Sequence, residues 1–542
     1  MKKIFLLLPF LWASTAFAVQ PDVPAQSSEG KNVPAPGGVS RARRAFELPE
    51  ITAEDVAKVV RPGTLLELTD AIPQALRKNL GLAVGRIEKS IVEDTPDIAE
   101  AAFDPKFSFS STYDTTGTTP YWKNNNTRTS NQGWNNSVEL SKKFAFGTEA
   151  KVYGNFNRGY NLDGNTPYTA DSSVSAGVSV AQPLLKGFGK KINLAPLVIA
   201  RQNVLKSGLS LRKTTLDLIY DTEVAYWNLS ASYALVSARL SSLRHAESVL
   251  EQVRKKRELK SGRAATLEDV LQAEAEVASR RVNLVRARQS VEDCDDKIRK
   301  LLGEKGDEDE ALVYRVATLA ETPENNETRS FGEWISAVRV FDIDLQIQEI
   351  EREQAQLNRE VAENADKPNL DLILGAEVGG RESSPWDAVR GAYGNDRRGY
   401  NLSAGIQFSV PIGFRASEAE LRQAMKRQQN VELATAQALQ NAMFDARSAW
   451  RSLEAARERL AAAQVALKMQ NESFKGQRAR YSLGEATLTD VLSAQDSLDA
   501  ARLEEIQAQL DVAVARAKTA RLDGRILSEN GFTWSELDES AE

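Results

Sequence analysis

The chain contains the same short turn sequence twice, 221 positions apart. One copy runs from Gly262 to Glu274 and the other from Gly484 to Gln495, and the two align without a gap from Ala265 and Ala486 onward. In each copy a glycine, which can adopt the positive φ of a helix C-terminus, is followed by a threonine and an aspartate, which cap helix starts. Each copy is therefore predicted to be the tip of a helical hairpin, in a chain built from two similar halves.

Long helical patterns flank both turns. No proline occurs from Leu197 to Leu302 or from Ile412 to Glu542, and apolar residues recur every seven positions, as in coiled coils. The heptad residues of the second half are Leu439, Ala446, Leu453, Leu460, Leu467 and Phe474. About 60 residues before the first tip would span on the order of 90 Å as a helix, far more than a compact domain. We interpret these heptad-spaced apolar residues as structural helix–helix contacts and not as a cofactor site.

The N-terminus has the pattern of a secretory signal. Lys2 and Lys3 precede an apolar run, and the sequence Ala16-Phe17-Ala18 predicts cleavage after Ala18. No later stretch has the ~18 consecutive apolar residues of a membrane-spanning helix. If the mature protein spans a membrane, it must do so as a barrel of strands.

Short alternating segments predict strands in both halves. They begin after Pro105 and Pro368 and return before Pro183 and Pro411. The first half is 35 residues longer here and contains a further predicted hairpin, 136–144 and 148–157, around Gly147. The pattern matches outer-membrane barrels, with a soluble β-sandwich insert as the alternative.

These signals divide the chain as follows: signal peptide 1–18, leader 19–64, first repeat 65–303, connector 304–330, second repeat 331–524 and C-terminal tail 525–542. The first repeat has strand region 103–183, helical hairpin 195–303 and tip 262–269, and the second has strand region 368–411, helical hairpin 413–524 and tip 484–490. The fold class is mainly α with a β-barrel part.

No catalytic or cofactor motif can be assembled, so we predict neither an enzyme nor a cofactor or metal. The single histidine, His245, is interpreted as a solvated surface residue and the single cysteine, Cys294, as an inert thiol. A formal charge of -6, with both signs interspersed, argues against a nucleic-acid partner.

The order of elements resembles that of the TolC-type outer-membrane efflux channels, from about Leu65 to Gly524. The matching motifs are Phe103-Asp-Pro105, Gln182-Pro-Leu-Leu185, Val410-Pro411, and the second tip from Tyr481 to Gln495. The resemblance implies a homotrimer with one barrel in the outer membrane and one helical tunnel in the periplasm. Members of the family normally give two strands per half; two to four strands per chain are too few to close a barrel, for which about eight is the small end.

The resemblance also implies partners and roles for the tips. Family members receive substrates from an inner-membrane transporter through a periplasmic adaptor, which docks on the tips; the residues for docking here are Gly262, Thr266, Leu267, Asp269, Gly484, Thr487 and Leu488. Tyr481 and Asp490 match residues that close the entrance, whereas Ala486 and Ser493 stand where the family has an arginine and a second aspartate. We therefore expect a weaker or differently built closure.

Two alternatives stay open. Asp490 can cap its helix without gating, and a gating ring of three Asp490 carboxylates would titrate above the usual aspartate pKa. The whole protein can be an export channel or a non-conducting periplasm-spanning scaffold, and only the channel needs alternating aromatic strands.

Overall fold

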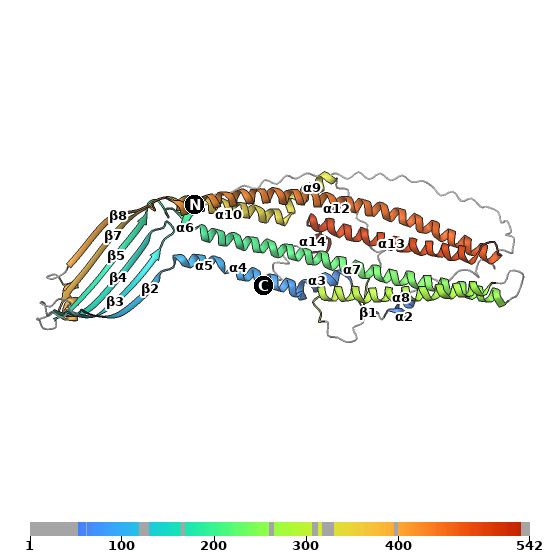
Figure 1. Ribbon diagram of the computed structural model, residues 1–542, viewed down its shortest axis with the longest axis horizontal. Coiled ribbons are helices and arrows are strands. Elements are labelled where there is room, and N and C mark those ends of the chain that lie inside the picture. The colour runs from blue at the N-terminus through green and yellow to red at the C-terminus, as the bar shows by residue number, and fades with distance from the viewer. Residues whose placement is uncertain are drawn as a thin grey trace, which may run out of the picture. The chain divides into compact units, whose positions relative to one another are not determined.

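The computed structural model describes residues 53–60, 62–118, 129–163, 169–258, 265–305, 313–316, 330–394 and 399–532 (Figure 1). All of the described helices and strands belong to one compact unit of the chain, Ile51–Glu542. The predicted signal peptide and Gly262 lie outside the described residues.

The two halves repeat one order of elements, as predicted. The first half contains α3 (Leu68–Lys78), α4 (Leu80–Glu93), α5 (Thr95–Glu100), η1 (Ala101–Phe103), β2 (Lys106–Thr118), β3 (Thr129–Lys143), β4 (Glu149–Asp163), β5 (Thr169–Pro183), α6 (Lys190–Asn193), α7 (Ala195–Glu258) and α8 (Leu267–Leu301). The second contains α9 (Phe331–Phe341), α10 (Ile343–Ala365), β7 (Asn369–Glu382), α11 (Pro385–Tyr393), β8 (Gly399–Ser409), α12 (Arg415–Leu483), α13 (Leu488–Leu522) and α14 (Arg525–Glu529).

Six strands form one antiparallel sheet in the order β2-β3-β4-β5-β7-β8, side by side in Figure 1. The first half gives four of these strands and the second half gives two. The total of six per chain exceeds the two to four that we expected, so that expectation was wrong. The hairpin β3–β4, close to where the alternation predicted it, accounts for the longer first half. Its turn contains Gly147 at φ +93°, and the Phe144 amide donates to the Thr148 carbonyl at 2.8 Å.

The strand register gives the sheet two chemically different faces. One row of directly paired residues crosses all six strands and is apolar: Phe107, Leu140, Val152, Val178, Ala376 and Leu402. The next row points the other way and carries five polar side chains and one glycine: Ser108, Glu139, Tyr153, Gly177, Glu377 and Asn401. We name these sides the apolar face and the polar face, because side chains alternate along every strand.

The long helices adjoin the end of the sheet where β2 and β7 begin and where β5 and β8 end. They form two long hairpins. Since α7 has 64 residues and α12 has 69, each is on the order of 100 Å long at ~1.5 Å per residue. The return helices α8 and α13 both have 35 residues. None of the helices in the described ranges is long and apolar enough to cross a membrane.

Two regions outside the predicted repeats also contain elements. The stretch assigned to a leader holds α2 (Ala53–Val59) and β1 (Pro62–Leu65), and β1 pairs in parallel with β6 (Val313–Arg315) from the connector. Their apolar residues Val60 and Val313 belong to the largest buried cluster, with Ile72, Ile219 and Ile298. The repeats therefore pack against segments that the sequence pattern left as linkers.

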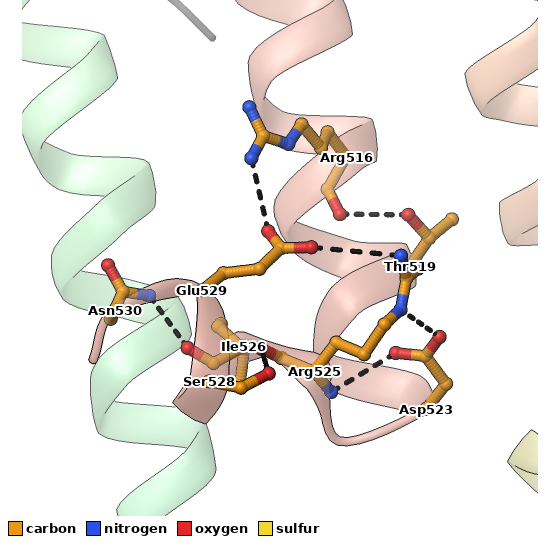
Figure 2. Close-up of polar contacts among 8 residues, drawn as sticks. All are labelled: Arg516, Thr519, Asp523, Arg525, Ile526, Ser528, Glu529 and Asn530. Atoms are coloured by element: carbon orange, nitrogen blue, oxygen red, sulfur yellow. Dashed lines mark hydrogen bonds and ion pairs between the residues drawn. The ribbon is translucent and has the colours of Figure 1, made fainter. Parts of the chain in front are cut away.

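The assigned C-terminal tail begins with a structured turn (Figure 2). Gly524 has φ +77° and starts α14, whose Ile526 is fully buried. Arg516 on α13 donates to the Glu529 carboxylate at 3.1 Å, and Arg525 pairs with Asp523. These contacts attach α14 to the end of α13.

Candidate functional site

The second tip has the turn geometry that the sequence predicts. Helix α12 ends at Gly484, which has φ +80°, and the Glu485 amide donates back to the Arg480 carbonyl at 2.9 Å. Thr487 then caps α13: its hydroxyl accepts from the Asp490 amide at 3.2 Å, while an Asp490 carboxylate oxygen accepts from the Thr487 amide at 2.9 Å. This reciprocal pair is a capping box, which satisfies two amides that the helix start leaves free.

The described part of the first tip repeats this cap. The Thr266 hydroxyl accepts from the Asp269 amide at 3.1 Å, and the Thr266 amide donates to the Asp269 carboxylate at 2.8 Å. The structure therefore shows the two sequence copies as equivalent helix starts. Gly262 is not among the described residues.

A shared apolar cluster joins the two tips. Its buried members come from all four hairpin helices and are Val249, Val253, Val270, Ala273, Phe474, Tyr481, Leu488, Val491, Leu492, Ala494 and Leu498. Leu488, which we expected to be available for docking, is only 4% exposed. Its counterpart Leu267 is 57% exposed, and Leu483 is 73% exposed. Among the described residues, the exposed apolar groups at the tips thus include Leu267, Leu271 and Leu483.

Lys256 on α7 makes the clearest polar contact between the hairpins. Its Nζ donates to the Tyr481 carbonyl at 2.6 Å and lies 3.5 Å from the centre of the Tyr481 ring. Burial lowers the pKa of Lys256 and raises that of Tyr481. We name this contact the Lys256–Tyr481 link. Sequence reasoning missed Lys256, because one lysine in a basic run gives no signal of its position.

Asp490 is exposed and engaged in its own capping box. Hydrogen bonds from Thr487 lower the pKa of Asp490. A carboxylate that accepts such bonds is stabilised in its charged form. In a single chain the pKa of Asp490 is therefore lowered, whereas repulsion among three carboxylates in a ring would raise it.

A second polar junction connects the hairpins farther from the tips. The Arg280 side chain on α8 is 8% exposed and contacts Asp499 on α13, with its Nη1 3.0 Å from the carboxylate. The Ser242 hydroxyl on α7 donates to the same carboxylate at 2.5 Å. Gln495 also donates to the Ser242 carbonyl, at 3.1 Å. Three helices thus meet at Asp499.

His245 is not the solvated residue we predicted. Its ring packs edge-on against Phe474, with 5.5 Å between the ring centres, and its Nδ1 is buried without a hydrogen-bond partner. Burial, together with the nearby Arg502 and Arg478 cations, lowers the pKa of His245 to about 4. Cys294 is half-buried, and burial raises its thiol pKa, which agrees with an inert cysteine.

The tips, the Lys256–Tyr481 link and the Arg280 junction are contacts that hold the two helical hairpins together. Among the described residues, no group of three or more histidines, cysteines, aspartates or glutamates can hold a metal ion. The arrangement can hold two hairpin ends together, and it can present exposed leucines to a partner.

Comparison with known proteins gives one consistent result. A family model described as outer membrane efflux protein matches residues 71–304 and 334–525. The outer membrane efflux protein BepC of Brucella suis is 24% identical over 374 residues, which are 68% of this chain and 76% of that protein.

Solved structures show the same fold at low identity. The CmeC outer membrane channel of Campylobacter jejuni has a TM-score of 0.64 and 15% identity, with 95% of this chain and 98% of that chain covered. The MtrE outer membrane channel of Neisseria gonorrhoeae, solved in an open state, has a TM-score of 0.60 and 18% identity, with 84% and 88% covered. These relatives are channels, not enzymes.

Proposed function

This chain belongs to the outer membrane efflux protein family, and on that premise we propose that it is the outer-membrane channel of a tripartite efflux or export system. In this proposal it takes substrates from an inner-membrane transporter and a periplasmic adaptor and passes them across the periplasm and the outer membrane. The observation that carries the proposal is the two-faced sheet, whose apolar row crosses all six strands, joined to two long helical hairpins. A sheet with one apolar and one polar face suits a wall between lipid and water.

We propose that the working unit is a homotrimer. Six strands are fewer than the about eight that close a small barrel. The outermost strands of the sheet are β2 and β8, and every residue of β8 is exposed. If β8 of one copy pairs with β2 of the next, three copies form a closed barrel of about 18 strands, in the size range that leaves an aqueous channel. This exceeds the twelve strands of a family trimer with two strands per half, a number from which the 35 extra residues of the first half already departed.

We propose that the tips dock the adaptor. Thr266, Thr487, Leu267 and Leu483 are exposed there and offer small polar and apolar groups. Gly484 has the positive φ that a tight turn requires, and the sequence predicts the same role for Gly262. The buried Leu488 serves instead to hold the second tip to the first.

We propose that the entrance is closed when the tips are held together. Tyr481 takes part in closure through the Lys256–Tyr481 link, which supplies a cation where Ala486 cannot. In a trimer, Asp490 contributes three carboxylates at the entrance. This closure is built differently from the arginine-based one that the resemblance implies.

Single-channel recording of the purified protein in a planar bilayer tests the proposed function. We expect discrete conductance steps that favour cations. The alternative, a non-conducting periplasmic scaffold, predicts no conductance from a correctly assembled trimer. A monodisperse monomer that stays in water without detergent would also refute the channel.

A further inference from the structure

Helix α11 lies on the apolar face of the sheet, at the end away from the long helices. It connects β7 to β8, whose other ends adjoin α10 and α12. Gly380 is four residues from Ala376 in β7 and therefore projects to the same face. A Cβ at Gly380 would collide with the α11 backbone, at 2.5 Å from the Ala392 nitrogen and 2.8 Å from the Gly391 carbonyl carbon. Only glycine allows this close approach.

The side of α11 that meets the sheet consists of small residues. Ala388 and Ala392 are 0% and 1% exposed, and Gly391 is buried between them. On β5, Ser172 projects to the apolar face and is completely buried. The helix is thus held against β5 and β7 by close backbone packing.

The opposite side of α11 carries two large aromatic residues and an arginine. Trp386 is 77% exposed and Tyr393 is 64% exposed, and Arg390 is exposed between them. Spacings of four and three residues place these side chains in one stripe along the helix. Asp387 is exposed as well, in the first turn of the helix. The stripe continues the apolar face, where Tyr400 is 75% exposed.

This combination fits the boundary between lipid and water. Tryptophan and tyrosine concentrate there, because their rings are apolar on one side and carry a polar group at the edge. Arginine is suited to phosphate, with which it makes charge-assisted hydrogen bonds. A helix that lies flat on a membrane surface has this division between its two sides.

We propose that α11 is an interfacial helix that rests in the headgroup layer of the outer leaflet. Trp386 and Tyr393 enter the layer, and Arg390 binds the phosphate of a lipid headgroup. The helix then fixes how deeply the channel sits in the membrane. This inference rests on the proposed function, because it needs the apolar face to contact lipid.

Fluorescence quenching tests the position of α11. Cys294 is the only cysteine, so Cys294→Ser provides a background for single labels in the full-length protein. The variants Trp386→Cys, Leu402→Cys and Asn401→Cys each receive an environment-sensitive fluorophore and are reconstituted into vesicles with lipids brominated near the headgroup or deep in the chains. Leu402 and Asn401 are neighbours in β8 on opposite faces of the sheet, and they serve as matched controls.

We expect headgroup-brominated lipids to quench the label at 386, either bromolipid to quench the label at 402, and neither to quench the label at 401. If 402 is quenched and 386 is not, the interfacial helix is wrong while the membrane position of the sheet stands. If 401 and 402 respond equally, the membrane position itself is wrong, and the proposed function fails with it.

The phosphate contact has its own test. Brominated phosphatidylglycerol should be enriched about fivefold near position 386 over brominated phosphatidylcholine at equal mole fraction, as expected for one arginine at an anionic surface. The added change Arg390→Gln should abolish this preference without moving the label out of the headgroup layer. A preference that persists in Arg390→Gln would overturn the role of Arg390.

Discussion

Replacing Lys256 with methionine removes the charge from the link between the two hairpin tips and keeps a long unbranched side chain against the Tyr481 ring. The lost contacts are the hydrogen bond from Nζ to the Tyr481 carbonyl, at 2.6 Å, and the cation–π contact, at 3.5 Å. Hydrogen bonds from charged groups contribute about 1.5–3 kcal/mol, and cation–π contacts about 0.5–2 kcal/mol.

The lower ends of these ranges apply, because burial lowers the pKa of Lys256 and so part of the gain offsets the desolvation of the ammonium. We therefore expect Lys256→Met to weaken the link by about 2 kcal/mol per copy, a factor of roughly 30 in the equilibrium between closed and open tips. The pH dependence follows from linkage: because burial lowers the pKa of Lys256 in the closed state, that state binds fewer protons than the open state, so wild-type closure should strengthen as the pH rises through the lowered pKa.

The assay is the open fraction of single channels in a planar bilayer. Lys255→Met is the matched control: Lys255 is the preceding residue, is exposed and pairs with Glu251 on its own helix. We expect Lys256→Met to be open far more of the time than wild type, and Lys255→Met to behave as wild type. Equal open fractions in all three proteins would refute the role of the Lys256–Tyr481 link in closure.

Three further predictions concern the other polar residues of the hairpins. Asp490→Ala should reduce the cation preference of the channel and weaken the start of α13 by removing its capping box; an unchanged preference would leave Asp490 as a capping residue only. His245→Phe should flatten the pH dependence of stability: the folded pKa of about 4 lies below the unfolded 6.5, so roughly 3 kcal/mol is present above pH 6.5 and lost as the pH falls to 4, as thermal unfolding would measure. Arg280→Met should destabilise the protein by about 3 kcal/mol by removing the cation that contacts the buried Asp499, and adding Asp499→Leu should recover most of the loss in chemical unfolding.

Controls exist within the repeat. Asp269→Ala removes the equivalent capping box from the first tip, so it separates the effect of capping from the effect of charge at the second tip. For the buried pair, a double variant as unstable as Arg280→Met alone would contradict the stated cause.

The elements whose signals are local could be predicted from the sequence. The alternation of Phe107 and Phe109 with serines identifies β2, and the glycine at 147 identifies the turn between β3 and β4. The heptad pattern identifies α12, which runs without interruption to Gly484. In each case the residues that decide the structure are neighbours in the chain.

The features that depend on long-range packing could not be predicted. Leu267 and Leu488 occupy equivalent positions in the repeat, yet one is exposed and the other buried, because the shared cluster surrounds only the second. Lys256 and Tyr481 are 225 residues apart. His245 gave no sign that it would pack against Phe474. Helix α11 did carry a signal, with Pro385 at its start and small residues on one side, but the surrounding strand pattern obscured it.

The added hairpin β3–β4 has a consequence for how such channels diverge. Because β3 and β4 lie as a pair between β2 and β5, β2 and β5 run in opposite directions, as two directly neighbouring strands of an antiparallel sheet would. In the proposed trimer, one inserted hairpin per chain therefore widens the barrel without altering the long helices, which are the parts proposed to meet the adaptor. Under that proposal, the width of the barrel and the docking of partners can change independently.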